Sequence, residues 1–238
     1  VWHPKTQSDP EYHYSGIMEA FRTAASKLPR VDGIGVSTAG VLIDNRVMVA
    51  SLFVKVNDED FERHVKNIYL DAAKELGENI PIEVANDGDV TALAGAMDLN
   101  DNGVLGIAMG TSEAGGYVDM HGNITGWLNE LAFVPVDFNR AAAVDEWSGD
   151  YGCGVKYFSQ DSAIKLAPAA GIPLDEALTP AEKLKIIQKL MAENDPRAVR
   201  IYETIGVYFG YAIAYYARFY DMRHVLIMGR VTSGEGGV

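Results

Sequence analysis

Asn86 and Asp87 form the first of several polar clusters that could carry chemistry. They follow residues 80–84, an apolar run typical of a strand, and precede an Ala-rich segment typical of a helix. Open α/β sheets bind ligands just beyond the carboxyl ends of their strands. A carboxylate there can accept the proton of a substrate hydroxyl while a phosphoryl group is transferred. Asp87 is therefore a candidate general base, although an aspartate at this place also suits a simple helix cap.

Residues 110–116, with the sequence GTSEAGG, could hold phosphate groups. Glycines let backbone amides approach phosphate oxygens, and threonine and serine hydroxyls add donors. The segment is not a Walker A loop, because no Gly-Lys-Ser/Thr follows it. Apolar runs on both sides, 104–109 and 117–120, predict a hairpin, and an ordinary hairpin turn remains the alternative. The candidate phosphate-binding residues are Gly110, Thr111, Gly115 and Gly116.

Two further segments could complete a site for a nucleotide and a sugar. Residues 224–228 have the pattern of a buried strand and lead into GRVTSG at 229–234, where small side chains would leave a slot for an adenine ring. Glu130 follows Trp127 on a predicted loop, and a carboxylate there can accept hydrogen bonds from sugar hydroxyls. A plain strand–helix connector and a surface glutamate beside a core tryptophan are the simpler interpretations. The nucleotide candidates in this stretch are Gly229, Ser233 and Gly234.

The elements that must position these residues alternate between helix and strand. Ser8, Asp9 and Pro10 form a helix start signal. A long helix over 61–76 is expected to end at Gly77 in a left-handed cap. The polar break at 98–103 is the predicted boundary between an N-terminal lobe, 1–101, and a C-terminal lobe, 102–238. Further strands are expected at 32–36, 41–43 and 47–49, and further helices at 90–97, 146–167, 180–193 and from 195 to about 220.

Composition limits the function classes. The 238-residue chain has a formal net charge of -13, which argues against nucleic acid or an anionic membrane as the main partner. The most apolar stretch, 204–217, is shorter than the roughly 18–20 residues that span a bilayer. One cysteine, Cys153, allows neither an internal disulfide nor a Cys-rich zinc site, and it fits a reducing, cytoplasmic compartment. The sequence therefore indicates a protein that acts on a small molecule.

The order and spacing of these motifs resemble the ROK family (repressors, uncharacterised open reading frames and sugar kinases) of the actin/hexokinase/Hsp70 superfamily. The segment IGVSTAG at 34–40 is similar to the family's IGxxxPG loop, and IEVAND at 82–87 to its strand ending in E-N-D. The segment LGIAMGTSEAGG at 105–116 resembles the second phosphate hairpin. NELAFVPV at 129–136 resembles GEIGHxPV, and VLIMGRVTSG at 225–234 resembles the adenosine motif.

The resemblance implies a two-lobed ribonuclease-H-like (actin-like ATPase) fold with mixed α/β sheets flanked by helices. It implies phosphorylation of a hydroxyl on a sugar or sugar derivative, with ATP and Mg²⁺ as cofactors. It gives the role of catalytic base to Asp87 and substrate-binding roles to Asn86, Glu130 and Gly40, in a cleft between the lobes. It also implies a sugar as the partner molecule, no nucleic-acid or membrane partner, and a homodimer.

Several positions depart from the family pattern. Phe133 replaces a sugar- or zinc-binding histidine and Val155 a sugar-binding glutamate, while Cys153 is all that remains of a zinc cluster, so no zinc site is expected. Glu113 would repel a triphosphate unless it helps to hold magnesium or points away. The family's opening DxGGTK hairpin is not found in these residues; either it precedes Val1 or the chain is not a working kinase. A non-catalytic sugar or nucleotide sensor on the same fold is thus the alternative.

Overall fold

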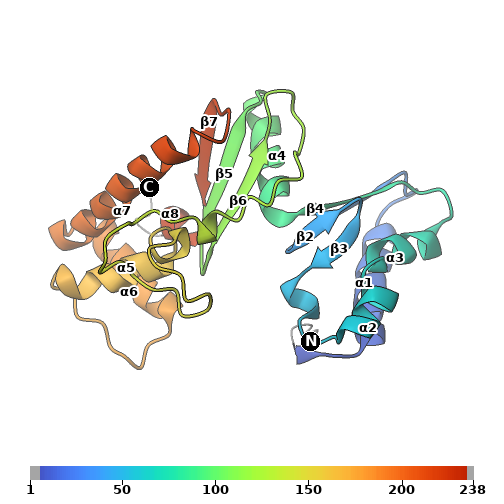
Figure 1. The fold of residues 1–238 in the computed structure, drawn as a ribbon, viewed down its shortest axis with the longest axis horizontal. Helices are drawn as coiled ribbons and strands as arrows, with labels where there is room; N and C mark the ends of the chain where they lie inside the picture. Colours follow the sequence, from blue (N-terminus) through green and yellow to red (C-terminus); the bar gives the residue numbers. More distant parts are fainter. Residues whose placement is uncertain (1–5, 235–238) are drawn as a thin grey trace. The chain divides into compact units, whose positions relative to one another are not determined.

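The structure, a computed structural model, describes residues 6–234 and has the mixed α/β architecture that the sequence predicts. Figure 1 follows the alternation of helices and strands along the chain. Contacts divide the chain into two compact units, one ending at Val90 and the other beginning at Thr91. The predicted lobes, 1–101 and 102–238, stay a prediction, and their limit falls in the polar segment 98–103.

The first unit combines a parallel pair of strands with a hairpin. The parallel pair joins β1 (Ile34–Thr38) to β4 (Ile82–Asn86), and the hairpin joins β2 (Val41–Ile43) to β3 (Arg46–Val49). Between β3 and β4 the chain forms a 3-10 turn at Ser51–Phe53 and a π-helical turn at Phe61–Val65. The α-helices of this unit are α1 (Pro10–Ala25), α2 (Asp58–Asp60) and α3 (Ile68–Leu76).

One face of the β1–β4 sheet is covered. Asp9 caps α1 by accepting the Glu11 amide at 3.0 Å, as its start signal predicts. The buried face of α1, which includes Ile17, joins a core with α3 and with Val84 of β4. The residues that alternate along the strands with these core residues point to the other face. Gly35, Ser37 and Glu83 lie there and are exposed. The first unit is therefore a sheet with one buried and one solvated face.

The strands expected at 41–43 and 47–49 form a hairpin, and its turn also fastens it to the sheet. Asp44 and Asn45 have φ values of 51° and 63°, the left-handed geometry of a two-residue hairpin turn. The Asn45 side chain then donates to the Ile82 carbonyl at 3.1 Å and accepts from the Val84 amide at 2.6 Å. One carboxamide thus binds the edge of β4 as a neighbouring strand would.

The second unit contains a three-stranded sheet in the order β6–β5–β7. Its central strand, β5 (Val104–Met109), runs antiparallel to β6 (Glu113–Val118) and parallel to β7 (His224–Met228). Helix α4 (Asp87–Leu99) starts in the first unit and continues into the second. The other helices are α5 (Gln160–Ala169), α6 (Pro180–Ala192), α7 (Pro196–Tyr216) and the short α8 (Arg230–Ser233), with 3-10 turns at Leu131–Phe133 and Gly154–Lys156.

Helices cover both faces of this second sheet (Figure 1). Gly106 of β5 lies against Ala92 of α4, because a Cβ at Gly106 would come within 3.2 Å of the Ala92 Cβ. The alternate residues Leu105 and Ile107 are fully buried on the opposite face, in the core formed with α5, α6 and α7. Since both faces are buried, β5 reads as a nearly continuous apolar run.

Three predicted elements are wrong in extent. The helix expected over 61–76 is interrupted before α3, and Gly77 has φ 171°, an extended rather than a left-handed conformation. The helix expected over 146–167 begins only at Gln160, because Gly152 has φ 67° and a Cβ there would collide with the Asp137 carbonyl. The turn expected over 110–116 ends at residue 112, because β6 begins at Glu113.

The remaining helices follow their sequence signals. Thr179 and Glu182 form a capping box that starts α6. Asp195 caps α7, whose buried positions recur with helical spacing. No helix in the described part of the chain is long and apolar enough to cross a membrane.

Candidate functional site

The carboxyl edge of the first sheet carries the predicted base and its neighbours. Because β1 and β4 are parallel, with Thr38 opposite Asn86, the segments that leave both strands lie at one edge. The Asn86 side chain donates to the Gly40 carbonyl at 2.9 Å and accepts from the Gly88 amide at 2.8 Å. These two bonds bring Gly40 and Asn86 together and fix the orientation of the carboxamide.

Asp87 is the first residue of α4 and is exposed to solvent. Its Oδ1 accepts the Gly88 amide at 3.0 Å, which is a local, cap-like contact. A negatively charged side chain is favourable at the N-terminus of a helix. Asp87 can therefore cap α4 and still present a carboxylate to a molecule that approaches the edge.

Gly40 has a structural reason to be glycine. Its φ is 120°, and a Cβ there would collide with the Val49 carbonyl and with Ala50. The loop after β1 can therefore approach the end of β3 only without a side chain. The predicted contact of Gly40 with substrate stays a prediction.

The carboxyl edge of the second sheet brings two predicted nucleotide segments together. Since β5 and β7 are parallel, with Ala108 opposite Met228, the chain leaves both strands at the same edge. Gly229 has φ 99°, and a Cβ there would collide with the backbone of Met109, the residue before Gly110. The segment that starts at Gly229 therefore packs directly against the end of β5.

The turn between β5 and β6 presents backbone donors. The Gly110 amide donates to the Ser112 carbonyl at 2.9 Å, and the Gly110 carbonyl accepts the Gln160 amide at 2.9 Å, so both ends of the turn are fixed. Thr111 and Ser112 are exposed, and within residues 6–234 no backbone carbonyl accepts the amide hydrogen of either. A phosphate oxygen can use these two amides without breaking a hydrogen bond of the turn.

Gly115 and Gly116 do not lie in this turn. They are buried inside β6, where they pair with Ile107 and Gly106 of β5. A Cβ at Gly115 would come within 2.5 Å of the Asn129 carbonyl, so this glycine lets residues 129–131 pack closely on the strand. The structure thus gives Gly115 a packing role, and the phosphate-binding role of both glycines stays a prediction.

Gln188 of α6 organises the segment after β7. Its buried side chain donates to the Arg230 carbonyl at 2.6 Å and occupies the space that a Cβ at Gly234 would need. Sequence reasoning missed this residue; the available signal was a glutamine among the buried positions of α6, beside Leu184 and Ile187. The predicted adenine-binding side chain of Ser233 lies outside what the structure describes.

Glu113 points into the core and away from the phosphate turn. It is only 4% exposed, and within the described chain neither of its carboxyl oxygens has a hydrogen-bond partner. This burial raises the pKa of Glu113 to about 8, so that the group is mostly protonated at neutral pH. The sequence left two possibilities for this glutamate beside a nucleotide: it helps to hold magnesium, or its side chain points away. The structure favours the second.

Glu130 is exposed on the loop before the 3-10 turn at Leu131–Phe133, as predicted. The neighbouring Asn129 is anchored, because its side chain is buried and accepts the Tyr220 hydroxyl at 3.0 Å. Trp127 stacks on Tyr117, with ring centroids 5.7 Å apart and planes at 19°, yet it remains 52% exposed. The loop therefore offers a carboxylate and part of an aromatic face to solvent.

The donor groups of the described residues bear on metal binding. Within residues 6–234 no three His, Cys, Asp or Glu side chains are grouped so that they could hold a metal ion. Cys153 is buried, and burial raises the pKa of its thiol. Magnesium in phosphotransferases is commonly held by one or two carboxylates, substrate phosphates and water, so this donor set is compatible with Mg²⁺ brought by a nucleotide.

Comparisons with known proteins place the fold. No protein-family model matches the sequence, and no curated protein sequence matches it. Among solved structures, the ROK hexokinase of Thermus thermophilus is similar to this chain, with a TM-score of 0.68 and 19% sequence identity. The match covers 94% of this chain and 71% of the hexokinase chain. A ROK-family glucokinase from Streptomyces griseus, solved with glucose and AMPPNP, matches 92% of this chain and 72% of its own, with a TM-score of 0.61 and 18% identity.

A regulator shares the fold as well. A ROK-family transcriptional regulator, homologous to the E. coli MLC protein, matches 93% of this chain but 56% of its own, with a TM-score of 0.65 and 21% identity. At these identities the likeness shows the fold. The resemblance to the ROK family that the motifs indicate is therefore confirmed at the level of the fold.

Proposed function

We propose that this protein phosphorylates a hydroxyl of a sugar or sugar derivative with ATP, on a two-lobed ribonuclease-H-like fold. One observation supports the proposal most. A chain that folds like ROK sugar kinases carries a fixed asparagine and an exposed aspartate at one sheet edge, and a turn with available amides at another. Phosphoryl transfer needs both kinds of group.

Asp87 takes the role of general base in this proposal. Its carboxylate accepts the proton of the attacking hydroxyl as the oxygen–phosphorus bond forms. Asn86 positions the sugar, and the two hydrogen bonds that hold its carboxamide keep it from turning during the reaction. Glu130 accepts hydrogen bonds from sugar hydroxyls, and Gly40 borders the sugar.

The nucleotide side is assigned to the second sheet edge. The amides of Thr111 and Ser112 bind phosphate oxygens, Gly110 leaves room for them, and Gly229, Ser233 and Gly234 border the adenine. Gly115 and Gly116 are included because the motif resembles the family's phosphate hairpin. Mg²⁺ bound with the nucleotide would neutralise phosphate charge and would be held mainly by the phosphates and water.

The setting of the reaction belongs to the same proposal. The acidic composition and the single cysteine support a cytoplasmic location. Family resemblance supports a homodimer, which light scattering of the purified protein measures directly. The acceptor is assigned only as a polyhydroxylated small molecule.

A second candidate is a non-catalytic sugar or nucleotide sensor. Phe133 and Val155 stand where the family carries sugar-binding side chains, and Phe133 packs against Trp147 with ring centroids 5.6 Å apart. The ROK transcriptional regulator with the same fold shows that this architecture also occurs in a regulatory protein. Binding of a sugar without turnover would be the mark of this function.

The test separates the two candidates. The purified protein is incubated with MgATP and a panel of monosaccharides, ADP release is followed, and the product is identified by ³¹P NMR. Melting temperature is measured with the same sugars. A sugar that raises the melting temperature and is phosphorylated supports the kinase. A sugar that raises it without ADP release supports the sensor and contradicts the kinase.

A further inference from the structure

A cavity of about 360 Å³ lies within the second unit, lined by residues from the 137–143 segment, α5 and α7. This volume is in the range of roughly 300–1,000 Å³ typical of small-molecule sites. Its lining includes none of the residues assigned to phosphoryl transfer. The cavity is thus a separate place where a ligand could bind.

Tyr157 fixes the polar side of the cavity. Its hydroxyl donates to Asp137 at 2.6 Å and accepts the Ala143 amide at 3.2 Å. Asp137 also accepts the Asn139 amide at 2.9 Å. The hydrogen bond from Tyr157 lowers the pKa of Asp137, because it stabilises the charged form. The carboxylate charge in this cavity is therefore already satisfied by protein donors.

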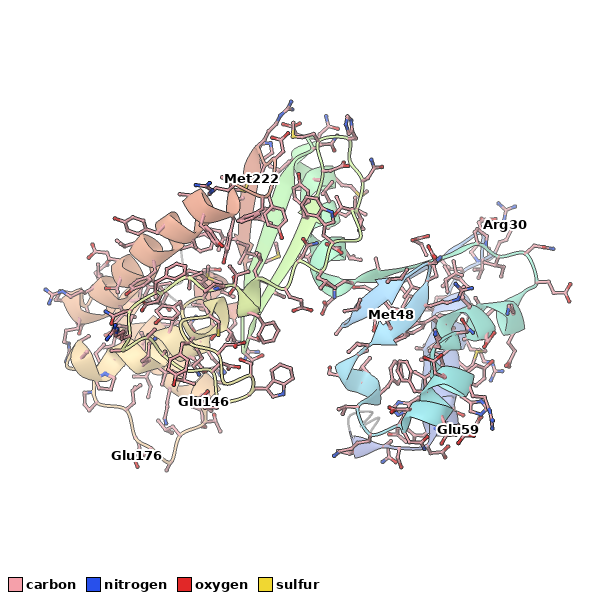
Figure 2. All side chains as sticks on the ribbon, in the orientation of Figure 1. Arg30, Met48, Glu59, Glu146, Glu176 and Met222 are labelled. Atoms are coloured by element: carbon pink, nitrogen blue, oxygen red, sulfur yellow. The ribbon has the colours of Figure 1, made fainter. Side chains whose placement is uncertain are left out.

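Lys165 is in the opposite situation. Its ammonium lies 4.2 Å from the centroid of the Tyr157 ring and donates to the Lys156 carbonyl at 3.2 Å. Among the described residues it forms no ion pair, whereas Lys156 pairs with Glu146, labelled in Figure 2, and with Asp161, each at 2.8 Å. Partial burial lowers the pKa of Lys165, but the residue remains accessible from solution.

Apolar groups form the rest of the cavity wall. Leu166 of α5 and Ile205 of α7 contribute aliphatic surface, and Tyr208 packs on Tyr157 with ring centroids 5.1 Å apart. The cavity therefore combines an aromatic and aliphatic wall with one cation that forms no ion pair among the described residues, although Asp137 and Asp161 attract it at longer range. We propose that it binds a small organic anion with an apolar body, whose carboxylate pairs with Lys165 while its body contacts Leu166, Ile205 and Tyr208.

Benzoate serves as the probe, with benzyl alcohol and benzylamine as neutral and cationic counterparts of similar size. Binding to the full chain is measured by NMR titration. We expect a Kd for benzoate on the order of 1 mM, since small ligands reach only modest affinity. Benzyl alcohol should bind about tenfold more weakly, because it lacks the charge-assisted contact. Equal binding of benzoate and benzyl alcohol, or stronger binding of benzylamine, would overturn the proposal.

Variants locate the site. Lys165→Met keeps the apolar stem and should weaken benzoate binding about tenfold, Lys165→Arg should restore most of it, and Lys189→Met on the exposed side of α6 is the control. In the wild-type protein, benzoate should slow acetylation of Lys165 by acetic anhydride, read by mass spectrometry, and leave Lys189 unchanged. This labelling needs no variant to fold. Benzoate binding that Lys165→Met does not change, or acetylation of Lys165 that benzoate does not slow, would refute the assignment.

Discussion

The two units present polar residues at the carboxyl edges of their sheets, but they hold those edges by different means. In the second unit the sheet is buried on both faces, and the glycine at 229 lets one backbone pack on another. In the first unit the sheet has one solvated face. The Asn86 side chain ties the loop after β1 to the carboxyl edge, and the Asn45 side chain ties the hairpin to the lateral edge of β4. The nucleotide-side edge is thus fixed by packing, whereas the sugar-side unit adds side-chain hydrogen bonds to the close packing at Gly40.

This difference has a consequence for mutation. Close packing of backbone on backbone tolerates no added atom, so a substitution at Gly229 should act mainly on stability. Hydrogen bonds of partly solvated side chains are worth about 1 kcal/mol each, so substitutions of Asn45 or Asn86 should leave the fold intact.

The largest expected effect concerns Glu113. Its pKa is raised from 4.5 to about 8, so the folded state keeps a proton that the unfolded state has released in this interval. The contribution of Glu113 to the free energy of unfolding is fully present below pH 4.5. It is lost as pH rises towards 8, at about 1.4 kcal/mol per pH unit. Denaturant unfolding at several pH values measures it. Glu113→Gln should flatten this slope, and equal slopes in the two proteins would contradict a buried, protonated Glu113.

The next prediction compares how substitutions at two glycines of the second edge change the free energy of unfolding. Gly229→Ala should lower the free energy of unfolding by at least about 2 kcal/mol, because its φ is left-handed and the added Cβ meets the backbone of Met109. Gly110→Ala should change it by less than about 1 kcal/mol, since only the Ser112 carbonyl lies near, at 3.8 Å.

The matched pair is measured by urea unfolding and by nucleotide titration. Gly110→Ala should weaken MgATP binding about tenfold, because its Cβ enters the space that a phosphate would use. A Gly110→Ala protein that binds MgATP like the wild type would remove the turn from the nucleotide site. An equally stable Gly229→Ala protein would show that packing does not fix this edge.

The smallest effect belongs to the first edge. Asn45→Gly removes two hydrogen bonds to β4 without disturbing the left-handed turn, and should destabilise the protein by about 1–2 kcal/mol. Asp44→Gly, with the same turn geometry, is the control and should be neutral within about 0.5 kcal/mol. Thermal unfolding of both variants measures the difference. Equal stability of the pair would mean that the Asn45 bonds do not hold the edge.

Local signals in the sequence predicted the elements that are determined locally. The start signal at Asp9 and the apolar run of β5 each specify their element within a few residues. The failure over 146–159 has a physical cause in the same terms. Gly149 and Gly152 both have positive φ, and the glycine-rich run was the available signal against a helix.

The candidate site could be predicted only in part from the sequence, because its geometry depends on residues that are far apart along the chain. The sequence located Asn86 and Asp87 at a strand end, and the structure adds the bond from Asn86 to Gly40. It could not indicate that Glu113 points inward, since alternation along β6 fixes the face only once its first residue is known. Gln188 was equally hidden, because its contact with Arg230 joins segments far apart in the chain.

The most direct test of the central claim is the turnover of Asp87→Asn on a sugar that the wild-type protein phosphorylates. The expected result is a kcat lowered by about 10²–10⁴, with sugar affinity within about threefold of wild type, because only the proton acceptor is lost. Glu83→Gln, which changes an exposed carboxylate of the preceding strand β4, is the control and should keep full turnover. Unchanged turnover in Asp87→Asn would contradict the role of this residue as the base.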